Sequence, residues 1–96
     1  MLLEKPRTQG DVITVKLTSG EEVIARLEEE TATGVKITKP MMLSMSQQGV
    51  GMMPYMFTVN PNTSIVINHT AIAVLSATDP DFAKQYTTST TGIQMA

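Results

Sequence analysis

The stretch that decides the fold is DVITVKLT at residues 11–18, followed after Ser19 and Gly20 by EEVIARLEEE at residues 21–30. In both runs apolar and polar residues alternate, which predicts two strands that each bury one face. The Ser-Gly pair between them predicts a hairpin turn. The sequence GVKITKP at residues 34–40 predicts a third alternating strand after a turn at residues 31–34. The predicted core face is Ile13, Val15, Leu17, Val23, Ala25, Leu27, Val35 and Ile37.

The composition changes after Pro40, where methionines gather around the turn-like sequence QQGVG. This pattern predicts an extended hairpin arm with legs over residues 41–46 and 53–59. Two or three methionines are easily explained as fillers of an irregular core. Six of them beside a glycine turn favour a contact surface for another chain. The predicted partner-binding residues are Met41, Met42, Met45, Met52, Met53 and Met56.

Two more strands are predicted over residues 64–67 and 71–78, after the sequence Asn-Pro-Asn-Thr interrupts the pairing. Both strands are apolar on both faces. In so small a domain such strands need a cover for the second face or the edge, and another copy of the same chain is the simplest cover. We therefore expect self-association.

The chain is expected to form a single domain, in which residues 1–10 lead into a barrel over residues 11–78. Five short strands with tight turns and no crossover helix predict a mostly β fold, a small and strongly bent antiparallel barrel of SH3-like or OB-like type. Residues 79–96 are predicted to hold a short helix and a disordered tail. Asp79 is the expected N-cap and Pro80 the first helical residue, and we expect the helix to end near Tyr86.

Charged residues make up only 17% of the 96 residues, with nine acidic and seven basic side chains. This is below the ~25% of an ordinary soluble domain, so we expect much of the surface to be covered. No apolar run reaches the ~18 residues that a membrane span needs, and no signal-peptide pattern follows Met1. We therefore expect a cytoplasmic protein that does not contact membranes.

Motifs for catalysis and cofactor binding are missing. With one histidine and no cysteine, a zinc site is not expected. No serine lies in a nucleophile-elbow sequence, and no Lys-Ser or Lys-Thr pair follows Gly49 and Gly51 as a phosphate-binding loop requires. The sequence predicts neither an enzyme nor a bound cofactor or metal.

Residues 10–40, GDVITVKLTSGEEVIARLEEETATGVKITKP, resemble the first motif of the Sm and Sm-like proteins, which include bacterial proteins of the Hfq type. The matching positions are Gly10, Val15, Leu17, Gly20, Ala25, Leu27, Val35 and Ile37. Residues 65–72, IVINHTAI, are similar to the second motif, a short turn between two apolar strands. This resemblance implies an Sm-like barrel whose fourth and fifth strands pair between subunits. Such pairing would produce a closed homo-oligomeric ring with a central pore.

The resemblance also implies that single-stranded RNA binds near the pore. The corresponding residues are Asn68 and His69 in the second motif, Thr33 and Gly34 in the turn before the third strand, and Lys36 as a phosphate partner. The chain departs from the family pattern, because Thr33 and Gly34 replace the usual pair that ends in Asn. An alternative interpretation is an adaptor ring that binds a partner protein through the methionine-rich arm and does not bind nucleic acid.

Overall fold

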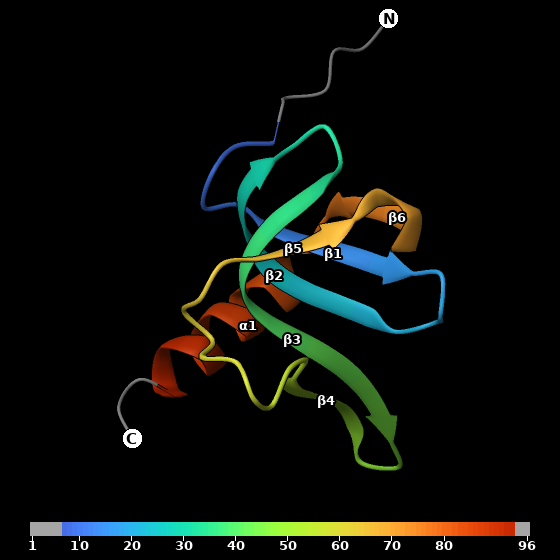
Figure 1. The fold of residues 1–96 in the computed structure, drawn as a ribbon. Coiled ribbons are helices and arrows are strands. Elements are labelled where there is room, and N and C mark those ends of the chain that lie inside the picture. The colour runs from blue at the N-terminus through green and yellow to red at the C-terminus, as the bar shows by residue number, and fades with distance from the viewer. Residues whose placement is uncertain (1–6, 94–96) are drawn as a thin grey trace, which may run out of the picture.

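The computed structural model describes residues 7–93, which form a single antiparallel sheet and one helix (Figure 1). The strands are β1 (Val12–Leu17), β2 (Glu22–Glu30), β3 (Gly34–Ser46), β4 (Gly49–Pro54), β5 (Ile65–Asn68) and β6 (Ile72–Ala77). The 3-10 turn η1 (His69–Ala71) joins β5 to β6, and helix α1 (Pro80–Ile93) follows β6. The strand order is β4-β3-β2-β1-β6, and β5 also pairs with β3. The predicted mostly β, antiparallel class is confirmed, although the sheet has six strands within residues 7–93 and is not closed.

Two bulges bend β2 and β3 around the core. The register between these strands shifts once beside Lys39 and Pro40, opposite Ala25, and again at Glu28. Lys39 has a positive φ of 52°. Each bulge inserts one unpaired residue and increases the local bend. As a result, β3 pairs with β5 over its first four residues and with β4 after the bulge.

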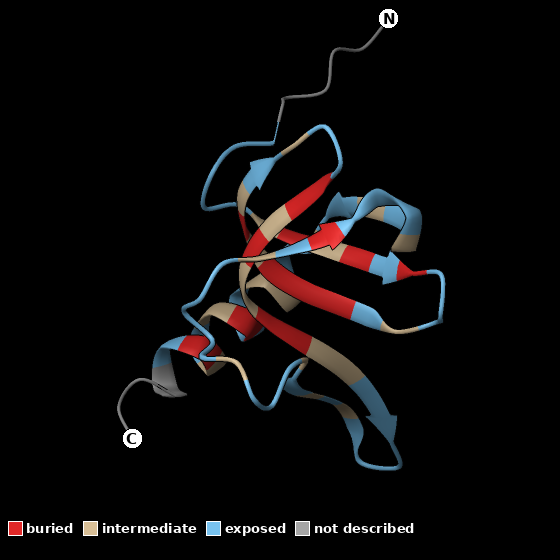
Figure 2. Cartoon of the chain, in the orientation of Figure 1, coloured by how far each residue is buried: buried red, intermediate tan, exposed pale blue. Residues whose placement is uncertain are grey.

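The inner face of the bent sheet forms the main core, and all eight predicted core residues are at most 4% exposed. Ile67 from β5 completes this cluster. Figure 2 shows the buried positions concentrated along β1, β2 and the first half of β3. The alternation in the first forty residues therefore gave the correct inner face.

Helix α1 packs on the outer face of the sheet, where Tyr86 contacts Ile24 and Met41 in a second buried cluster. The Tyr86 hydroxyl donates to the Lys39 carbonyl over 2.6 Å. The Arg26 guanidinium lies 6.0 Å from the centre of the Tyr86 ring. The helix thereby covers the bulge at Lys39 and buries part of the face opposite the main core.

The predicted end of this helix near Tyr86 is wrong, because α1 continues to Ile93. Two of the threonines that suggested a disordered tail, Thr87 and Thr90, satisfy their hydroxyls inside the helix. Thr87 donates to the Ala83 carbonyl and Thr90 to the Tyr86 carbonyl, each over 2.9 Å. Thr90 is also buried, so packing overrides the low helix propensity of threonine. The predicted start is correct, since Asp79 Oδ2 accepts from the Asp81 and Phe82 amides.

The predicted second leg of the arm, residues 53–59, is also wrong. Ser46 pairs directly with Gly49, so the turn contains only two residues and β4 begins at Gly49. Gly49 has φ 119°, a backbone conformation that glycine adopts without strain. Residues 56–59 lie outside the strands. The lead over residues 1–10 is described only from Arg7, and residues 94–96 of the predicted tail lie outside the described residues.

Candidate functional site

Four of the five residues predicted to contact RNA come together where the β2–β3 turn meets the end of β5. We call Thr33, Gly34, Asn68 and His69 the turn cluster. Backbone pairing places Gly34 opposite Asn68. The His69 amide donates to the Thr33 carbonyl over 2.9 Å. The side chains of Thr33, Asn68 and His69 are exposed, so a ligand can reach them.

Local hydrogen bonds fix the shape of the turn cluster. The Gly34 amide donates to Thr31 Oγ1 over 3.0 Å, and His69 Nε2 lies 3.2 Å from the Thr31 carbonyl oxygen. Asn68 Oδ1 accepts from both the amide and the hydroxyl of Thr70. Within residues 7–93, the side-chain nitrogen Nδ2 of Asn68 and the ring nitrogen Nδ1 of His69 have no hydrogen-bond partner. The cluster therefore offers an amide donor and an imidazole nitrogen on an ordered backbone.

Gly34 has a packing role in this cluster, because the chain of β5 passes directly over it. A Cβ atom at this position would lie 2.4 Å from the Ile67 carbonyl oxygen. Lys36, the fifth predicted contact, lies outside the cluster, between Glu29 of β2 and Val66 of β5 in the sheet. It is half-buried and belongs to the same strand face as Gly34.

Strands β5 and β6 each have a free edge. Within residues 7–93, β5 pairs only with β3 and β6 only with β1. Because the His69 amide donates toward β3, the alternation of an antiparallel ladder turns the amides of Val66 and Asn68 toward the free edge of β5. Residues 40–78 contain no Asp, Glu, Lys or Arg, so no charge protects these edges.

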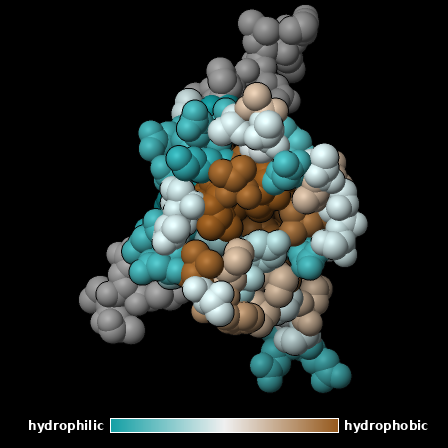
Figure 3. Space-filling model, in the orientation of Figure 1, coloured by the Kyte–Doolittle hydropathy of each residue, from teal (hydrophilic) through white to brown (hydrophobic). Residues whose placement is uncertain are grey.

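Apolar side chains on the same two strands are incompletely covered. Val66 is 55% and Val74 57% exposed, while Ile65, Ile72 and Leu75 are only partly buried against the core. Figure 3 shows an apolar patch at the centre of the face on which β5 lies. An uncharged strand edge beside an apolar surface is a typical site of association between chains.

Of the six methionines predicted to bind a partner, three are buried or half-buried and three are exposed. The first group is Met41, Met42 and Met52, and the second group is Met45, Met53 and Met56. Met41 is buried, and Met52 packs against the cluster of Ile24, Met41 and Tyr86. Met42 is half-buried, whereas Met45 is 80% exposed and Met53 and Met56 are also exposed. Phe57, 75% exposed, belongs with the second group and was not predicted. The sequence feature that could have indicated its exposure is its position directly after Met56, in a segment without the alternation of a strand.

No group of three or more His, Asp or Glu side chains that could hold a metal ion occurs in the described part of the chain. Comparison of the chain with models of protein families and with curated proteins finds no match in either. Among residues 7–93 there is also no helix with the length and apolar character needed to cross a membrane. The candidate site consists of the turn cluster and the free edges of β5 and β6.

Proposed function

We propose that this chain is an Sm-like subunit that joins copies of itself into a closed ring and binds single-stranded RNA at the turn cluster. The observation that carries the proposal is the pair of free, uncharged edges on β5 and β6. Pairing of β5 in one subunit with β6 in the next covers both edges and the apolar side chains beside them. Because the two edges belong to different surfaces, the contact is head to tail and closes into a ring when the rotation permits.

The turn cluster supports RNA as the ligand. Sequence-specific RNA recognition uses single-stranded bases whose edges hydrogen-bond to amide and imidazole groups such as those of Asn68 and His69. Lys36 supplies a cation for a backbone phosphate. Arg7 pairs with the Glu30 carboxylate, at 2.9 Å, and so neutralises the acidic residue closest in sequence to the β2–β3 turn. A ring repeats the cluster in every subunit, which converts weak single contacts into useful affinity.

The ring is tested by native mass spectrometry of protein purified without nuclease, comparing the natural chain with Val66→Pro and Val66→Thr. Proline removes an amide that points to the free edge of β5, whereas threonine keeps this amide and the branched shape of valine. We expect one closed oligomer for the natural chain and for Val66→Thr, and a monomer for Val66→Pro. A natural chain that is monomeric, or a Val66→Pro variant that keeps the oligomer, contradicts the ring.

RNA binding is tested separately with a fluorescent single-stranded RNA of about 18 nucleotides, on the natural chain and on Asn68→Ala and His69→Ala. Loss of one hydrogen-bonding group per subunit is expected to weaken binding at least about tenfold, since about 1.4 kcal/mol corresponds to a factor of ten. Thr58→Ala, an exposed change outside the cluster, is the control. Equal affinity of all four proteins, or no binding by the natural chain, contradicts the RNA part and leaves the ring intact.

A further inference from the structure

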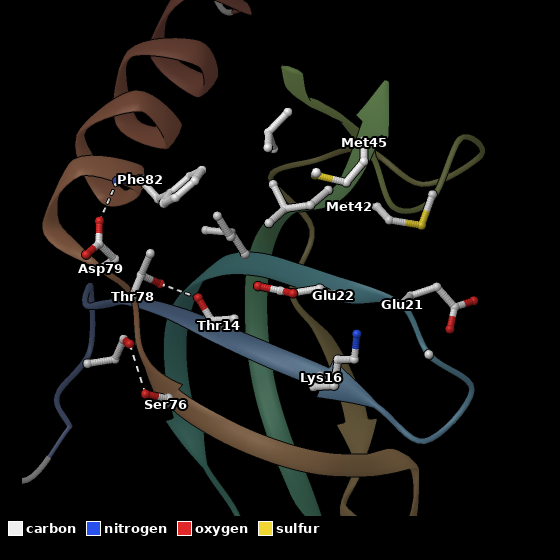
Figure 4. A pocket seen from close by; sticks show the side chains of 15 residues that line it. Thr14, Lys16, Glu21, Glu22, Met42, Met45, Ser76, Thr78, Asp79 and Phe82 are labelled. Carbon is white, nitrogen blue, oxygen red and sulfur yellow. Dashed lines mark hydrogen bonds between the residues drawn. The ribbon is translucent and has the colours of Figure 1, made fainter. Parts of the chain in front are cut away.

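A groove with a volume of about 610 Å³ lies on the outer face of the sheet and shares no residue with the turn cluster. Its floor is formed by β1 and β2, one wall by the first turn of α1, and the other wall by the β3–β4 hairpin (Figure 4). We call this site the outer groove. The residues that matter for its chemistry are Lys16, Glu21, Glu22, Leu43, Met45 and Phe82.

One part of the outer groove is apolar. Phe82 from α1 and Leu43 from β3 face it from opposite walls, above the buried Ile24. Met45 extends over the same space and is 80% exposed. Methionine is flexible and polarizable, so it adapts to apolar side chains of different shapes. An aliphatic side chain bound here displaces water from Phe82, Leu43 and Met45.

The other part of the outer groove is mainly acidic. Glu21, Glu22 and Asp79 contribute three carboxylates, against one amine from Lys16. Lys16 is the cross-strand neighbour of Glu22, but the two form no ion pair in the described structure. The Asp79 carboxylate caps α1. Glu21 Oε1 accepts from the Ser19 hydroxyl, which leaves Glu21 Oε2 and the Glu22 carboxylate available to a cation that approaches from outside.

We infer that the outer groove binds an extended segment of a partner protein in which an aliphatic side chain is followed by lysine or arginine. The aliphatic group fits the space between Phe82 and Leu43, and the cation fits beside Glu21 and Glu22. A second copy of this chain is a poorer occupant. Within the described residues, its large exposed apolar side chains, which include Phe57, Val66 and Val74, lie in residues 40–78, where no Lys or Arg follows along the chain. The lysines next to Val66 and Val74 are on neighbouring strands, so they are not part of the same extended segment. This inference depends on neither the ring nor RNA binding.

The probe is an acetylated and amidated peptide with two leucines followed by two lysines, added to the isotope-labelled full chain and followed by amide chemical shifts. Two matched peptides replace the lysines by glutamates or the leucines by serines. We expect saturable shifts of amides in the outer groove with the first peptide, and at least about tenfold weaker binding of the other two. No saturable shift there at millimolar peptide, or equal binding of the glutamate peptide, overturns the inference.

Glu22→Gln and Glu29→Gln form the matched pair of variants. Both residues are exposed on β2, but only Glu22 lines the outer groove. Glu22→Gln is expected to weaken binding of the leucine-lysine peptide by about threefold or more, and Glu29→Gln to leave it unchanged. Equal effects of both variants mean that the peptide responds only to net charge, which overturns the site. A changed oligomer mass for Glu22→Gln alone assigns the outer groove to a second copy and also overturns the inference.

Discussion

Residues 7–39 and residues 40–78 differ in the charge that they carry and in whether their strands have a free edge. The first region contains β1, β2 and the start of β3, and it carries charged residues on its outer positions. It also supplies all eight residues of the predicted core face. The second region contains β4, β5 and β6, each with a free edge within the described residues, and has no Asp, Glu, Lys or Arg. Charged side chains thus lie on the solvent-exposed surface of the first region. The uncharged strand edges of the second region are where we expect contact with other chains.

The largest expected effect is the loss of core packing in the first region. Leu27, 2% exposed, lies in the main core, and Leu27→Ala is expected to lower the free energy of unfolding by about 2–5 kcal/mol through lost burial and a cavity. Met45→Ala, in the exposed arm, is expected to change it by no more than about 0.5 kcal/mol. Urea denaturation at one fixed protein concentration measures both. A comparable loss for Met45→Ala would show that the arm is part of the folded core.

The packing of β5 from the second region on β3 from the first region can be disrupted at Gly34, whose missing side chain lets the two strands approach each other. Gly34→Ala places a methyl group 2.4 Å from the Ile67 carbonyl oxygen, so the backbone of β5 must move. We expect a loss of about 1–3 kcal/mol in the free energy of unfolding, the usual cost of overpacking.

Gly51→Ala in β4 is the matched control for this change, because a Cβ there meets only Ser44 Oγ at 3.7 Å, an ordinary contact. Both variants are measured by urea denaturation, together with amide hydrogen exchange of β5. Faster exchange in β5 for Gly34→Ala alone would locate the damage between β3 and β5. If the two glycine variants lost equal stability, close packing at Gly34 would not be the cause.

The strands and core residues of the first region could be predicted from the sequence, because the alternation of apolar and polar residues is a local pattern. Alternation alone identified Ile13 and Leu27 as core residues. It could not show that Ile24, on the opposite face, is buried, because the helix that covers it begins only at Pro80. The juxtaposition of Thr33 with His69 followed from the family resemblance, whereas the outer groove brings together residues from β1, β2, β3 and α1 that no local pattern relates.

A smaller effect than that of Leu27→Ala is expected at Tyr86, which joins α1 to the bulge where the two regions meet. Its hydroxyl donates to the Lys39 carbonyl over 2.6 Å, and the Lys39 amide donates to the Pro61 carbonyl over 2.7 Å. Tyr86→Phe keeps the packing of the ring and removes one hydrogen bond. We expect a loss of about 1 kcal/mol in the free energy of unfolding at pH 8, measured by thermal denaturation.

The same pair of proteins gives a pH dependence with a definite sign. Burial raises the pKa of Tyr86 from its ordinary value of 10.0 to about 12, and the opposing effect of Arg26 is smaller. Because the folded-state pKa lies above the unfolded-state value, the contribution of the neutral phenol is complete below pH 10 and is lost as the pH rises through 12. The stability difference between the natural chain and Tyr86→Phe is therefore expected to shrink between pH 10 and pH 12. Since every other ionisable group is common to both proteins, the difference isolates Tyr86, and a constant difference over this range would show that its phenol is not held neutral by the fold.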